Sequence, residues 1–162
     1  MRFIEINEIW EWCKIRGVIL AENGTLLDDP TLSHHKRAVY AAGRRSGRES
    51  SVAAACARAL DRWDECLLWA RGWGVWGSGE DWPAYYSLRG AQAERRSLDK
   101  APGHLFGTGE RDLFVTFLTQ VMENAWDADV LVAPRIKRIH VSHDEWLELR
   151  STTPTDFAPV AV

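Results

Sequence analysis

The clearest amphipathic pattern in the chain predicts a central packed helix near 110–125. Apolar residues recur there on one side of a helix, at positions 113, 114, 117, 118, 121, 122 and 125. Thr108 is expected to cap this helix. A second helix is predicted to begin at Ser50 or Ser51, because apolar residues at helical spacing follow. Its buried face is expected to hold Val52, Cys56, Ala59, Leu60 and Trp63.

Three more helices are predicted from their terminal residues. Asn7 can cap a helix that ends at Gly17, and Asp81 can cap a helix that has Pro83 in its first turn. Asp29-Pro30 predicts a short helix in the same way. That helix would carry His34, His35, Lys36, Arg37 and Tyr40.

Short apolar runs between the helices predict strands. "ADVLVA" (128–133) and "KRIHVS" (137–142) are two of them, and a bulky run beginning at Glu65 is a third. Asn23-Gly24 lies between two apolar runs, which is a hairpin signal. Because few strand–helix–strand units alternate, we expect an α+β fold in a single domain over 1–150, with helices packed on a small, mostly antiparallel sheet around the central helix. A loosely ordered tail is expected over 151–162.

Composition restricts the classes of function. The chain has 162 residues, 46% hydrophobic and 27% charged, with a net charge of −3 and a pI near 6.0. This balance does not favour nucleic acid or an anionic membrane as a partner. Acids interrupt the N-terminal apolar residues and no run approaches a membrane span, and the three cysteines form no CxxC pair. We therefore expect a cytoplasmic protein without a cofactor.

The stretch "HVSHDE" (140–145) places His140 and His143 beside two acids. They are the candidate metal ligands of the chain, but zinc needs three or four converging ligands and no third one is suitably spaced. Ser142 and Glu145 match the S-x-x-E of a capping box. The sequence therefore predicts that this stretch begins a helix, with metal binding or general-base chemistry as the alternative.

Nine tryptophans are a surplus; we expect a core role for most of them, and such side chains are also enriched at binding hot spots. "GWGVWG" (72–77) matches G-x-G-x-x-G, but its bulky residues and the lack of a strand–helix frame argue against dinucleotide binding. A structured loop that presents tryptophans fits better, although core packing is the alternative for the same rings. The residues expected to bind a protein partner are Trp73, Trp76, Trp82, Arg44, Arg45 and Arg48.

A basic segment runs from Ser33 to Ser51, with five Lys or Arg residues and one acid. It can be a solvated loop, or it can bind an acidic protein or nucleic acid through residues 36–48. Tyr40 is its only aromatic residue, which is poor for stacking on single strands. A nucleic-acid-binding accessory protein is therefore an alternative function rather than the first one.

Enzymatic chemistry has weaker candidates. There is no G-x-S-x-G motif, and "APGHLFGTG" (101–109) places His104 in a predicted glycine-rich loop. A small hydrolase-like or metal-dependent enzyme that uses His104, or His140 and His143, is the second hypothesis, and nucleic-acid binding is the third.

"AWDADVLV" followed by "IHVSHDEW" resembles the C-terminal part of small bacterial immunity proteins, which are encoded near polymorphic toxins. The resemblance covers about a quarter of the chain. It implies a single-domain cytoplasmic protein that binds and blocks a toxin, and it assigns no site residue. The first hypothesis is thus a non-enzymatic protein-binding module of bacterial type.

Overall fold

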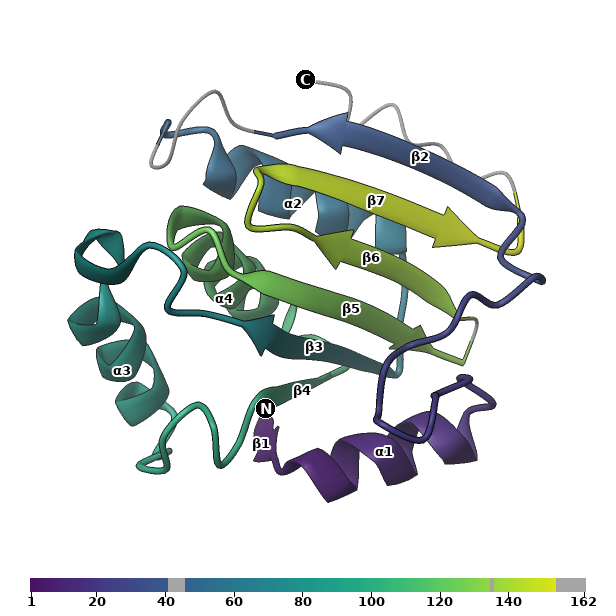
Figure 1. Ribbon diagram of the computed structural model, residues 1–162, viewed down its shortest axis with the longest axis horizontal. Coiled ribbons are helices and arrows are strands. Elements are labelled where there is room, and N and C mark those ends of the chain that lie inside the picture. Colours follow the sequence, from purple (N-terminus) through teal and green to yellow (C-terminus); the bar gives the residue numbers. More distant parts are fainter. Residues whose placement is uncertain (41–45, 135, 154–162) are drawn as a thin grey trace.

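Seven strands form one antiparallel sheet in the computed structural model, which describes residues 1–40, 46–134 and 136–153 (Figure 1). The order across the sheet is β1-β4-β3-β5-β6-β7-β2. The strands are β1 (Arg2–Ile4), β2 (His34–Val39), β3 (Glu65–Gly72), β4 (Gly103–Gly107), β5 (Asp127–Ala133), β6 (Lys137–Val141) and β7 (Trp146–Ser151). The helices are α1 (Ile6–Ile15), α2 (Glu49–Leu60), α3 (Trp82–Ala91), α4 (Arg111–Glu123) and the short 3-10 helix η1 (Gly77–Gly79). The predicted α+β class in a single domain is confirmed.

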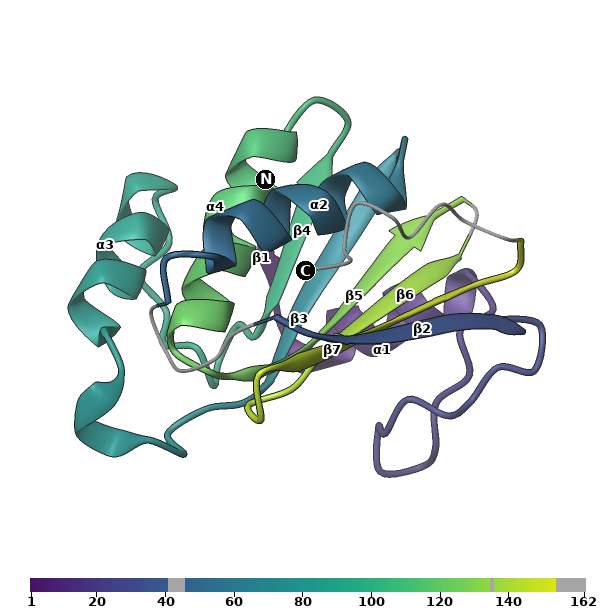
Figure 2. The same ribbon diagram turned by 90° about the horizontal axis from the view of Figure 1, so that it is seen from above.

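Helices α2 and α4 cover one face of the sheet, and α1 lies on the opposite side (Figures 1 and 2). The apolar stripe of α4 is buried, as its periodicity predicted: Phe114, Phe117, Leu118, Val121 and Met122. The same face of the sheet supplies alternate strand residues such as Val130, Ile139 and Leu147. Each such side chain contributes about 1.5–3 kcal/mol on burial, so this layer holds most of the fold together.

A smaller core lies between α1 and the strands β1, β4, β3 and β5. Ile9, Trp12 and Cys13 of α1 pack there on residues such as Leu67 and Leu131. Gly103 is required at this contact, because a Cβ at that position would lie 2.5 Å from the side chain of Ile4. Because the described part of this core includes residues of β1, β4, β3 and β5 and none of β6, β7 or β2, helix α1 covers only part of this face.

A buried polar cluster joins β4 to α3. His104, which was expected in a loop, lies on β4 and is fully buried. Its Nδ1 is 3.1 Å from the carbonyl of Leu68, and its Nε2 is 2.5 Å from the hydroxyl of Tyr85. Arg89, also fully buried, donates to the Tyr85 hydroxyl and to the carbonyls of Arg96 and Ala101. The cluster fixes the segment between α3 and β4, so the predicted loop around His104 is wrong and the residue lies on a buried strand.

The helix predicted after Asp29-Pro30 is wrong, because residues 34–39 form strand β2. The Asp29 carboxylate does accept from the amide of Thr31, at 2.8 Å, but it closes a turn and not a helix. Pairing with β7 supplies the backbone hydrogen bonds of the segment. Asn23-Gly24 forms a turn as predicted, and the hairpin around it is reduced to one bridge between Leu20 and Leu26.

The helix predicted to begin at Ser142 is also wrong. Ser142 to Glu145 form the turn of a hairpin between β6 and β7. The hydroxyl of Ser142 accepts from the amide of Asp144, at 3.2 Å, and Glu145 has a left-handed φ of 64°. A turn followed by a left-handed residue is a standard hairpin connection, and it uses Ser142 without any helix.

Smaller expectations at the ends of elements are settled as well. The helix predicted from Asp81 is confirmed, with its carboxylate accepting from the amide of Ala84 at 3.0 Å. Thr108 does not cap α4; its hydroxyl donates to the carbonyl of Trp63. Ser151, the first residue of the predicted tail, belongs to β7, and the tail beyond residue 153 lies outside the described residues.

No helix in the described part of the chain has the length and apolarity needed to span a bilayer.

Candidate functional site

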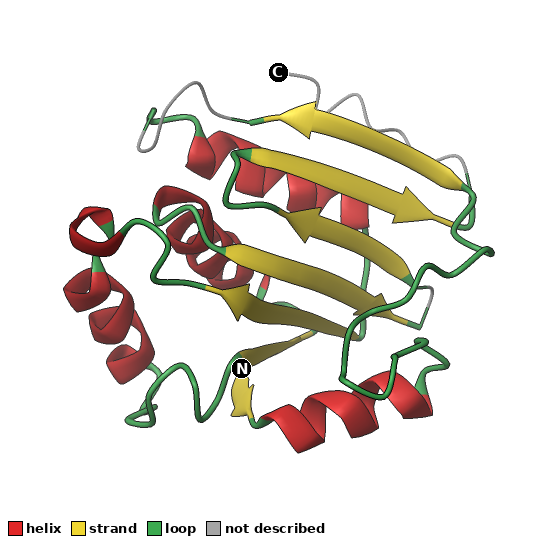
Figure 3. Ribbon diagram, in the orientation of Figure 1, coloured by secondary structure: helices red, strands yellow, loops and turns green. Residues whose placement is uncertain are grey.

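The sheet continues past α1 onto β6, β7 and β2 (Figure 3). On these strands, polar side chains replace the apolar ones on the face that carries α1. We call this surface the open face. Strand register orders its side chains into two rows across the sheet. One row is Asp129, His140, Glu148 and Arg37, and the next is Arg138, Arg150 and His35.

Asp129 is the anchor of the open face. Its side chain is 1% exposed and contacts two guanidinium groups and the ring of His140. Arg138 Nε lies 3.0 Å from one carboxylate oxygen, Arg71 Nη1 lies 3.3 Å from the other, and His140 Nδ1 is 3.2 Å away. Burial alone would raise the pKa of Asp129, but the hydrogen bond from His140 and the charges of Arg138 and Arg71 outweigh it and lower that pKa. Asp129 is therefore an ionised buried carboxylate.

Arg138 and Arg150 are direct cross-strand partners, an arrangement that is unfavourable for like charges. Carboxylates offset the repulsion. Arg138 binds Asp129, while Arg150 binds Asp28 at 2.5 Å and Glu148 at 3.2 Å. Each guanidinium thus has at least one counter-charge of its own.

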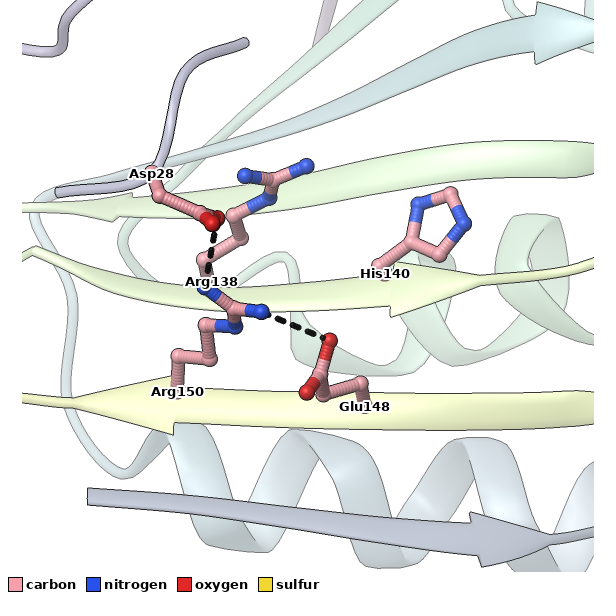
Figure 4. A pocket seen from close by; sticks show the side chains of 5 residues that line it. All are labelled: Asp28, Arg138, His140, Glu148 and Arg150. Atoms are coloured by element: carbon pink, nitrogen blue, oxygen red, sulfur yellow. Dashed lines mark hydrogen bonds and ion pairs between the residues drawn. The ribbon is translucent and has the colours of Figure 1, made fainter. Parts of the chain in front are cut away.

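A small pocket of about 100 Å³ lies among these side chains. Figure 4 shows Arg138 and His140 extending from β6, Arg150 and Glu148 from β7, and Asp28 reaching in from the segment before β2. The pocket is lined by opposite charges, so it suits a charged or strongly polar group and not an apolar ligand.

His143 forms a second histidine–aspartate pair. Its ring Nδ1 is 2.9 Å from the Asp127 carboxylate, and its backbone amide donates to the same group. The hydrogen bond with Asp127 raises the pKa of His143. His140 and His143 therefore use different aspartates, and no group of three metal-ligating side chains is present among the described residues. The two histidines that were the metal candidates act here as partners of carboxylates.

The tryptophans expected to bind a partner are placed differently from one another. Trp82 packs against the main core, with its ring 4.8 Å from that of Trp126. Trp73 is partly buried against the same core, and Trp76 is 45% exposed. Only Trp76 of the three has the exposure that a binding anchor needs.

The basic residues expected beside them fall in and around an undescribed segment. Arg48 is exposed at the start of α2, and Arg44 and Arg45 lie outside the described residues. The basic stretch continues along β2, where Arg37 is exposed and its guanidinium lies over the ring of Trp146, 4.0 Å from the centroid. The structure therefore places the described basic residues at the β2 edge of the sheet.

Sequence reasoning missed Asp127, Asp129 and Glu148, and with them most of the open face. Asp129 lay inside a run interpreted only as an apolar strand, and Asp127 directly preceded that run. Their spacing of two residues was the available signal, because it puts both carboxylates on one face of that strand. Glu148 and Arg150 have the same spacing, but they were assigned to a helix, where this spacing separates side chains.

Comparison with protein-family models, with curated proteins and with solved structures found no match to this chain in any of the three.

Proposed function

We propose that this chain is a protein-binding module and that its partner is an acidic protein. The observation that carries the proposal is the charge at the β2 edge. Strand β2 contains Lys36 and Arg37 and no acid. The first acid after it, Glu49, is buried, with its carboxylate 2.8 Å from the amide of Ser46. A surface with this charge attracts an acidic partner in a chain whose own net charge is −3.

The hydrogen bonds of the open face support binding more than catalysis. The rings of His140 and His143 contact aspartates, as a general base does, but in the described chain neither ring contacts a hydroxyl or thiol. A nucleophile in contact with its base is what covalent catalysis needs. Opposed charges around a small pocket are instead suited to the polar rim of a protein interface.

An immunity protein that binds and neutralises a toxin is the specific form of this proposal. The resemblance of residues 125–146 to immunity proteins supports it, and those residues include β5 and the β6–β7 turn beside the open face. The proposal places the protein in the bacterial cytoplasm, without a cofactor.

Proteins encoded beside the gene for this chain are the partners to test first. Each is purified, mixed with this chain and examined by size-exclusion chromatography and calorimetry. We expect one acidic partner to form a complex that weakens with added salt. Reversing two edge charges, K36E/R37E, should weaken it about tenfold or more, since each exposed ion pair contributes up to about 1 kcal/mol and reversal adds repulsion.

The matched control is R62E/R95E, which makes the same change in net charge at two exposed loop arginines. Equal weakening by both double variants would mean that net charge alone drives the association. Absence of a complex with any neighbouring product would contradict the proposal. Tight binding of a short RNA or DNA with a steep salt dependence would replace it with the nucleic-acid alternative.

A further inference from the structure

We infer that the partner binds by adding a strand to β2, through an extended acidic segment that pairs with its free edge. This inference rests on the proposed function and specifies how the partner binds. Among the described residues, β2 is the last strand of the sheet and its one ladder is with β7. An edge strand presents a row of unpaired N–H and C=O groups to which another chain can bind.

The direction of the backbone groups follows from the register. Tyr40 donates its amide to the carbonyl of Glu145, at 2.9 Å, in line with the β2–β7 ladder. In an antiparallel ladder such bonds alternate along each strand. The backbone groups of Ala38 and Lys36 therefore also face β7, and those of His35, Arg37 and Val39 face outward. Outside the strand ladders, no backbone hydrogen bond donated by the amides of these three residues is present within the described chain.

Of the devices that usually protect an edge, β2 has charged side chains, Lys36 and Arg37, and lacks others. The strand has six residues, contains no proline, and pairs with β7 without a bulge. At the other end of the sheet β1 has only three residues, which limits any pairing there. Val39 is 66% exposed on β2, so its apolar side chain is accessible to a neighbouring strand.

The side chains of β2 define the chemistry of the added segment. His35, Arg37 and Val39 project on the open face, while Lys36 projects on the helix face. A paired segment therefore meets a positive charge on each of its own faces. Acidic residues at adjacent positions satisfy both charges, and a β-branched residue packs on Val39.

A synthetic peptide in which adjacent pairs of Glu are separated by Thr and Val is the direct probe. Its control has the same charge, with one central Thr replaced by Pro, which removes a ladder donor. We expect saturable binding of the first peptide and binding of the second that is weaker by about tenfold, the effect of one or two lost hydrogen bonds. Equal binding of both peptides, or no saturable binding of either, would overturn the inference.

Amide hydrogen exchange followed by NMR provides the test that needs no variant. In the free protein the amides of Arg37 and Val39 should exchange fast, and those of Lys36 and Ala38 slowly. Binding of the acidic peptide, or of a protein partner, should slow exchange at Arg37 and Val39 specifically. Protection elsewhere with none at these amides would show that the partner binds another surface, so strand addition would be wrong while protein binding stood.

Val39→Pro removes one outward amide and no charge, and Val39→Ala keeps the amide while removing the same side chain. We expect V39P to weaken peptide binding about tenfold relative to V39A. Equal affinities of the two variants would contradict pairing at this edge. If V39P does not fold, the exchange experiment on the unaltered chain still decides the question.

Discussion

At the scale of single residues, Asp129 determines whether the open face is stable. Its carboxylate neutralises Arg71 and Arg138, which are themselves partly buried. Replacing it by Asn should cost about 2–4 kcal/mol, because two cations lose their counter-charge and hydrogen bonds to a charged acceptor. Urea unfolding of D129N beside the unaltered chain measures the loss. A change below about 0.5 kcal/mol would show that solvent already compensates the two arginines.

The same aspartate should give an acid-sensitive component of stability. Its pKa in the folded chain is below the value of about 3.9 expected for the unfolded chain. The stability that it contributes is therefore complete above that value and is lost as pH falls through the folded pKa. When the free energy of unfolding is measured between about pH 2 and 6, it should fall less steeply toward low pH for D129N than for the unaltered chain.

The pKa values of His104 and His143 should be shifted in opposite directions. Burial first, and the Arg89 charge second, lower the pKa of His104 to about 3. The hydrogen bond with Asp127 raises that of His143. Near pH 6.5 NMR should show a neutral His104 ring and a mostly protonated His143 ring. Asp127→Asn should lower the pKa of His143 and leave His104 unchanged; a His143 pKa that does not respond would exclude Asp127 as the cause.

At the scale of elements, the hairpin turn between β6 and β7 contains removable strain. Glu145 has a φ of 64°, a conformation that favours glycine. Its carbonyl, which accepts from Tyr40, is retained in Glu145→Gly. We expect E145G to stabilise the fold by about 0.5–1 kcal/mol in thermal unfolding, while Asp144→Gly does not. A loss of stability in E145G would mean that the Glu145 side chain contributes more than the turn costs.

Elements with strong internal periodicity were predictable from the sequence, and those defined by distant partners were not. Helices α2 and α4 each bury one continuous stripe, and β5 ends in the continuous apolar run 130–133. Strand β2 has alternating half-buried and exposed residues with many charges, so only its pairing with β7 identifies it as a strand. The Ser142–Glu145 pattern satisfies a helix cap or a hairpin turn equally well. The open face was missed for the same reason, because its rows exist only after four strands are placed in register.

At the scale of the whole molecule, the charges of β2 act against association of the chain with itself. Two copies that approached edge to edge would bring Lys36 and Arg37 of each close together, and like charges on neighbouring strands are unfavourable. An acidic segment meets no such barrier. The same residues would thus select the partner and exclude a second copy.

Neutralising both residues, K36T/R37T, removes that barrier and keeps the strand propensity of the segment. We expect the variant to form more dimer than the unaltered chain at the same concentration, measured by sedimentation velocity. Adding V39P to it should reverse the effect, because an outward amide needed for edge pairing is then missing. If K36T/R37T and the unaltered chain sediment alike at high concentration, the charges of β2 do not control edge pairing, and their role would be limited to the partner.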